Sequence, residues 1–158
     1  MKVTVNWKGD MTFAGESPSG FPIQMDSDSD FGGTNSGPRP MEMLAFGLAG
    51  CTGMDVLSIL KKKRQDVRQF DVRVDAPRSH EYPKVFTNAT ITYIASGRNI
   101  TEAAVLRAIE LTVTKYCPAQ IMLAKAFPID VQYEIYEEET GGGQRLIHQG
   151  VWQETTTE

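Results

Sequence analysis

The segment Met41–Met54 reads MEMLAFGLAGCTGM and contains the first of the two cysteines of this chain. It is apolar on nearly every side of a helix, and the pattern continues to Leu60, which is typical of a buried helix. Pro40 suits the first helical turn, and the basic run Lys61–Arg64 suits the negative end of the helix dipole. The sequence therefore predicts one long buried helix from Pro40 to about Lys63.

Both cysteines lie in apolar, helix-forming segments. Cys51 belongs to the long helix, and Cys117 lies in the segment KYCPAQ (Lys115–Gln120), directly before Pro118. A cysteine before a proline that opens a helix occupies the N-cap, where free N–H groups and the helix dipole favour the thiolate. Two cysteines in 158 residues are too few for a disulfide framework, so the sequence predicts a working thiol pair.

Three glycines, Gly47, Gly50 and Gly53, recur beside Cys51. Each costs roughly 1 kcal/mol relative to alanine inside a helix, so they indicate either close approach by another helix or access to the sulfur. The alternative is a tightly packed core helix with an inert cysteine. Asp55 falls one turn after Cys51 and would oppose thiolate formation, so we expect its side chain to point elsewhere or to make a structural hydrogen bond.

The rest of the chain predicts a single domain, residues 1–158. Its expected elements are short strands within 1–25, a polar loop over 26–40, strands at 69–76 and 85–95, helices at 101–116 and 118–126, strands at 129–135 and 146–152, and a frayed tail at 154–158.

Composition narrows the function class. The net charge of −4 argues against nucleic acid or an acidic membrane surface as a partner. The start of the chain alternates like a strand, so no signal peptide is expected, and the apolar runs predict no membrane span. We therefore expect a cytoplasmic protein, in which a permanent structural disulfide is disfavoured.

Arg39 and Glu42 flank the start of the long helix, three residues apart. They fit a surface ion pair, worth about 0–1 kcal/mol. They also fit a guanidinium that stabilises a thiolate and binds substrate oxygens, held by a carboxylate. Asp26–Asp30 lacks the glycine and glutamate positions of a calcium loop, and the histidines lack zinc-site spacing, so we expect no metal and no cofactor.

The motifs GPRPMEML (Gly37–Leu44) and GLAGC (Gly47–Cys51), with YCPA (Tyr116–Ala119), resemble the OsmC/Ohr family, the osmotically inducible and organic hydroperoxide resistance proteins. The chain looks most like the YhfA-like branch. The resemblance implies an α+β, OsmC-like fold, with antiparallel sheets packed on two central Cys-bearing helices in an intertwined homodimer. It also implies thiol-dependent reduction of organic hydroperoxides at the dimer interface, with Cys51 as the attacking and Cys117 as the resolving cysteine.

Two positions differ from the hydroperoxide-resistance pattern. Met41 stands where that pattern has a glutamate, with Glu42 adjacent. That pattern also uses an arginine from the N-terminal strands, whereas residues 1–38 contain none, and Arg39 is the candidate substitute. The resemblance leads us to expect a peroxidase with an organic hydroperoxide substrate and an external dithiol reductant, whereas the two departures favour a binding module. The alternatives are a non-catalytic dimer that binds an apolar ligand or senses electrophiles, and a structural dimer with inert cysteines.

Overall fold

The computed structural model describes residues 1–154 and confirms the α+β class. These residues divide into two compact units, residues 1–46 and the residues from Gly47 onward. The boundary falls inside the long helix, and the prediction of a single domain stays a prediction. Of the tail expected to be frayed, residues 155–158 lie outside the described part.

The first unit contains a small antiparallel sheet with the strand order β1-β2-β3. Its strands are β1 (Thr4–Gly9), β2 (Thr12–Glu16) and β3 (Pro22–Met25). They confirm the short strands predicted within residues 1–25. A single turn of 3₁₀ helix, η1 (Ser29–Phe31), follows in the polar loop.

Asp26 organises that polar loop. Its side chain is buried and accepts hydrogen bonds from the N–H groups of Ser27, Thr34 and Ser36 and from the hydroxyls of Thr34 and Ser36. Donation from Ser36 and Thr34 to the carboxylate lowers the pKa of Asp26 far below its ordinary value. The predicted polar loop is confirmed, but its Asp26 carboxylate is buried, because five donors replace water around it.

The long helix α1 (Pro40–Lys62) matches its predicted bounds to within one residue. In the second unit it buries Leu48, Val56 and Leu60. A Cβ on Gly53 would lie 2.8 Å from Val72 Cγ2, whereas a Cβ on Gly47 or Gly50 would meet nothing within 4 Å. Close approach, here by a strand rather than a helix, therefore explains Gly53 alone.

By length and composition, α1 is the one helix within residues 1–154 that could cross a membrane, with a mean hydropathy of 1.7 over its best window. One such helix is a weak indication of a span, because the core helix of a soluble protein meets the same criteria. A third of that window is buried within the chain. The expectation of no membrane partner stays a prediction.

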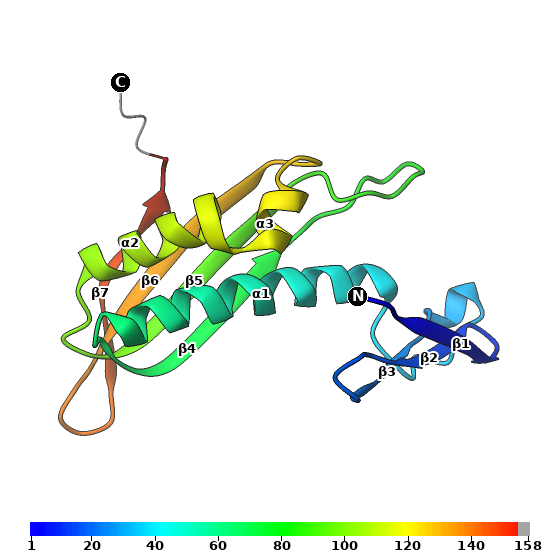
Figure 1. The fold of residues 1–158 in the computed structure, drawn as a ribbon, viewed down its shortest axis with the longest axis horizontal. Helices are drawn as coiled ribbons and strands as arrows, with labels where there is room; N and C mark the ends of the chain where they lie inside the picture. Colours follow the sequence, from blue (N-terminus) through cyan, green and yellow to red (C-terminus); the bar gives the residue numbers. More distant parts are fainter. Residues whose placement is uncertain (155–158) are drawn as a thin grey trace. The chain divides into compact units, whose positions relative to one another are not determined.

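The second unit is built on a four-stranded sheet with the order β4-β5-β6-β7. Figure 1 shows α1, α2 and α3 on one face of this sheet. The elements are β4 (Asp66–Asp75), β5 (Ala89–Arg98), α2 (Glu102–Leu111), the π-helical turn η2 (Thr112–Tyr116), α3 (Pro118–Leu123), β6 (Ile129–Glu138) and β7 (Gln144–Trp152). The core lies between the sheet and the helices and includes Val56, Leu60, Ile91, Ile109 and Ile135.

The sheet is mixed, since β5 and β6 run parallel while its other two strand pairs are antiparallel. The connection from β5 to β6 passes through α2, η2 and α3, and a parallel pair requires a crossover of this kind. That crossover carries Cys117 across the helical face of the sheet. The strand expected at 85–95 begins later, at Ala89.

Candidate active site

Cys117 lies at the junction between η2 and α3, where the backbone leaves the helical conformation at φ −77° and ψ 102°. Its N–H donates to the carbonyl of Thr112 at 3.0 Å, which closes the π turn. Its Sγ accepts from the N–H of Gln120 at 3.4 Å, and Pro118 occupies the first turn of α3. The predicted N-cap position of Cys117 is confirmed.

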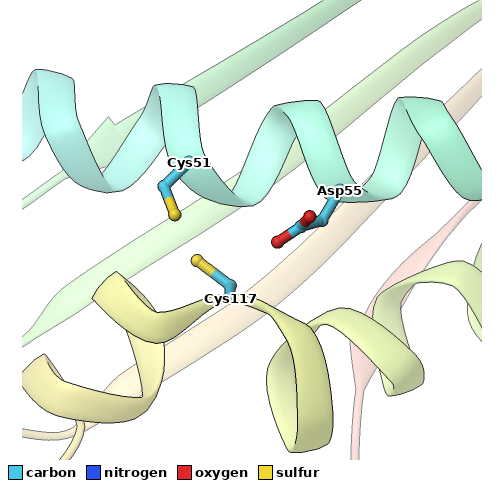
Figure 2. A group of neighbouring side chains, drawn as sticks. All are labelled: Cys51, Asp55 and Cys117. Atoms are coloured by element: carbon cyan, nitrogen blue, oxygen red, sulfur yellow. The ribbon is translucent and has the colours of Figure 1, made fainter.

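The helices bring the two cysteines together. Cys51 Sγ and Cys117 Sγ lie within 4.8 Å of each other, and neither is in a disulfide. Figure 2 shows the two side chains pointing toward one another, Cys51 from α1 and Cys117 from the start of α3. A disulfide holds its two sulfurs about 2 Å apart, so bond formation requires the two side chains to move toward each other by up to about 2.7 Å.

Asp55 also belongs to this cluster. Its carboxylate lies within 4.8 Å of both sulfurs and points at them from the next turn of α1 (Figure 2). The expectation that Asp55 points elsewhere is wrong. Residues four apart share one helix face, so the spacing that puts Cys51 toward α3 puts Asp55 there too.

The two thiols differ in environment. Cys117 is fully buried, whereas Cys51 is only half-buried. Burial raises the pKa of the Cys117 thiol to about 11, and donation by the Gln120 N–H offsets only part of this rise. The predicted thiolate-favouring effect of the N-cap is therefore outweighed by burial at Cys117, and Cys51 is the cysteine that solvent reaches.

A buried hydrogen-bond network links the elements beneath the pair. The hydroxyl of Thr52 donates to Gln120 Oε1 at 3.0 Å and is hydrogen-bonded to the hydroxyl of Tyr93, from β5. All three side chains are buried. Burial raises the pKa of Tyr93 well above its ordinary value, so this hydroxyl stays protonated as a hydrogen-bond partner.

Arg39 and Glu42, both in the first unit, do not form the predicted ion pair with each other. The Arg39 guanidinium donates to Asp28 Oδ2 at 3.1 Å and to the side-chain oxygen of Asn35. Glu42 Oε2 instead accepts from the backbone N–H of Arg39 at 2.8 Å. Glu42 thus caps the start of α1, because the first N–H groups of a helix lack partners within it.

The sequence reasoning missed the contributions of Asp55, Thr52, Gln120 and Tyr93. The spacing of Cys51 and Asp55 on one helix face was the available signal for Asp55. Thr52 follows Cys51, and Gln120 is three residues after Cys117, but nothing in the sequence joins either to a tyrosine on a strand.

Comparison with known proteins gives consistent matches. Residues 33–132 match the family model described as OsmC-like protein. Protein YhfA of Escherichia coli K12 is 42% identical over 135 residues, which cover 85% of this chain and 98% of that protein. The crystal structure of a hypothetical protein from Aquifex aeolicus VF5 has a TM-score of 0.76 and 29% identity, and the match covers 87% and 97% of the two chains.

A more distant structural match bears a functional name. The crystal structure of an organic hydroperoxide resistance protein from Legionella pneumophila has a TM-score of 0.57 and 14% identity to this chain. The match covers 85% of this chain and 96% of that one. At this identity the likeness concerns the fold alone.

Proposed function

This chain belongs to the OsmC-like protein family, within its YhfA-like branch, and on that premise we propose that it is a thiol-dependent peroxidase. It reduces organic hydroperoxides through Cys51 and Cys117. The observation that supports this most is the approach of the two sulfurs to within 4.8 Å, with one thiol buried and the other open to solvent. Structural neighbours named organic hydroperoxide resistance proteins agree with the reaction class.

In the first step the Cys51 thiolate attacks the terminal, hydrogen-bearing oxygen of the hydroperoxide and breaks the O–O bond. The sulfur is oxidised to a sulfenic acid, and the other oxygen leaves as an alkoxide that takes a proton to become the alcohol. Cys51 suits this step because it is the accessible member of the pair. The exposed apolar side chains Met54, Tyr116 and Met122 come from the same elements and favour an apolar hydroperoxide.

In the second step the sulfur of Cys117 displaces the sulfenic hydroxyl of Cys51. A disulfide forms, and the hydroxyl leaves as water with the Cys117 proton. Burial suits the resolving role, because a protonated, enclosed thiol does not compete for peroxide. An external dithiol then reduces the disulfide and is itself oxidised.

The proposal includes a homodimer in the cytoplasm, with a dithiol protein as the reductant. Exposed apolar residues on α1, including Leu44, Phe46 and Met54, favour a second copy of the chain as their partner.

A second candidate function is a dimer of the same fold that binds an apolar ligand or senses electrophiles without turnover. One observation favours it. The guanidinium of Arg39, the candidate substitute for the missing arginine, is already engaged by Asp28 and Asn35. This arrangement leaves no assigned cation to activate the thiol.

The deciding experiment is dithiol-coupled turnover of cumene hydroperoxide by the wild type, Cys51→Ser, Cys117→Ser and Arg39→Ala. We expect turnover by the wild type, none by Cys51→Ser, and a single turnover by Cys117→Ser followed by sulfinic acid at Cys51, seen by mass spectrometry. Arg39→Ala slows the reaction if this residue supplies the cation. An inactive wild type whose Cys51 still reacts rapidly with a thiol probe would favour the sensing function. Two unreactive cysteines would contradict both the peroxidase and the sensing function.

A further inference from the structure

The Asp55 carboxylate has no role in the proposed peroxidase reaction. It is half-buried and points at two thiols. Within residues 1–154, no group donates a hydrogen bond to it and no cationic side chain pairs with it. Asp26, the buried carboxylate of the first unit, accepts five hydrogen bonds by contrast. A carboxylate placed in this way lacks a positive partner.

The three donor atoms form a compact triangle. Cys51 Sγ, Cys117 Sγ and an Asp55 carboxylate oxygen all lie within 4.8 Å of one another. Around a tetrahedral zinc ion with bonds of about 2.3 Å to sulfur, two sulfurs lie roughly 3.8 Å apart. The side chains therefore need to close by at most about 1 Å, which rotations about their χ angles supply.

We propose that, in the reduced protein, Cys51, Asp55 and Cys117 bind one thiophilic divalent cation such as Zn²⁺, with water in the fourth position. Thiolate ligands select such cations over Mg²⁺ and Ca²⁺, which prefer oxygen. Each thiol that becomes a ligand releases one proton, and the carboxylate adds a third negative charge. The ion thereby supplies the positive charge that no side chain within residues 1–154 supplies to the Asp55 carboxylate.

The surroundings suit a bound thiolate. The Gln120 N–H already donates to Cys117 Sγ, and the Thr52 side chain holds the Gln120 side chain from the other helix. Such hydrogen bonds to ligand atoms orient them and stabilise their charged form. The same sulfurs cannot bind a metal and form a disulfide together, so the cation and peroxide compete for one pair of thiols.

The test uses Co²⁺ as a spectroscopic probe, added without oxygen to the full chain reduced with a phosphine. We expect one Co²⁺ per chain, with sulfur-to-cobalt charge-transfer bands and the visible bands of a tetrahedral site, all removed by Zn²⁺. Asp55→Asn keeps the size of the side chain and should weaken binding at least tenfold, as losses at metal sites commonly do. Asp71→Asn, at an exposed carboxylate on β4, should bind like the wild type.

Two further results would overturn the metal site. One is the absence of charge-transfer bands in reduced wild type, and the other is equal affinity in Asp55→Asn and the wild type. The disulfide form of the wild type should bind no cobalt. The peroxidase assay is to be run on metal-free protein, so that its failure leaves the cobalt result unchanged. A protein that reduces peroxide without binding cobalt would contradict this inference alone.

Discussion

The Thr52 hydroxyl donates to Gln120 Oε1 at 3.0 Å and so ties the residue after Cys51 to the first turn of the helix after Cys117. The same hydroxyl also bonds to Tyr93 on the central strand β5. Each cysteine is thus a neighbour of a side chain fixed to the other helix. We infer that this buried network, rather than contact between the sulfurs, sets the distance between the thiols.

Replacing Thr52 with valine should test this network. Valine keeps the shape but leaves the Tyr93 hydroxyl and the Gln120 amide oxygen each short of a buried partner. We expect the free energy of unfolding to fall by about 1–3 kcal/mol in urea titrations, together with slower disulfide formation. Ser58→Ala, at an exposed site on the same helix, is the control. A Thr52→Val protein as stable as Ser58→Ala would show that the network does not contribute to the free energy of unfolding.

Stability should depend on pH through Cys117. Because its folded pKa is raised from 9.0 to about 11, the unfolded thiol ionises first as the pH rises. Between these values the unfolded state binds fewer protons than the folded state, so the free energy of unfolding falls with rising pH. Serine at position 117 does not titrate in this range.

The measurement is the free energy of unfolding of reduced protein at intervals from pH 8 to pH 11. We expect the wild type to lose more stability over this range than Cys117→Ser. Parallel curves for the wild type and Cys117→Ser would contradict the raised pKa.

The sequence predicted the elements well because their signals are local. Each helix end is predicted by residues within one turn of it, as at Pro40, at the basic end of α1 and at the Cys117–Pro118 junction. The parallel pairing of β5 with β6 depends on the path of the crossover, which has no local signal. The partners of Arg39 were missed for a related reason. Asp28 is eleven residues away, and the folded loop around Asp26 brings it to Arg39.

The site shows the same limit. Helical spacing places Cys51 and Asp55 on one face, and in the structure this geometry prevails over the repulsion between a carboxylate and a thiolate that predicted the Asp55 side chain elsewhere. The thiolate at Cys117 was inferred from the N-cap alone. Burial, which depends on the packing of three elements, reverses its effect on the pKa.

Two glycines on α1 should respond oppositely to alanine. At Gly53 the added Cβ meets Val72 Cγ2 at 2.8 Å, and the stiff valine on β4 must shift. We expect Gly53→Ala to lower the free energy of unfolding by about 1–3 kcal/mol. At Gly47 the space is open within one chain, so Gly47→Ala should raise it by up to about 1 kcal/mol. Urea unfolding of both variants checks the pair, and equal effects would contradict the close approach of α1 to β4.

The proposed homodimer should depend on the exposed apolar side chains beside the thiol pair. Met54 is 74% exposed and Met122 64% exposed, although both are apolar. If a second chain covers them, a lysine at Met54 must be buried without a partner, which costs more than the lost apolar contact. We expect Met54→Lys to raise the dimer dissociation constant at least about tenfold, measured by sedimentation velocity over a range of concentrations. Gln69→Lys, at an exposed polar site on β4, should leave the dimer unchanged. A folded wild-type monomer at micromolar concentration would contradict the dimer itself, whereas a wild-type dimer that Met54→Lys does not weaken would place the interface on another surface.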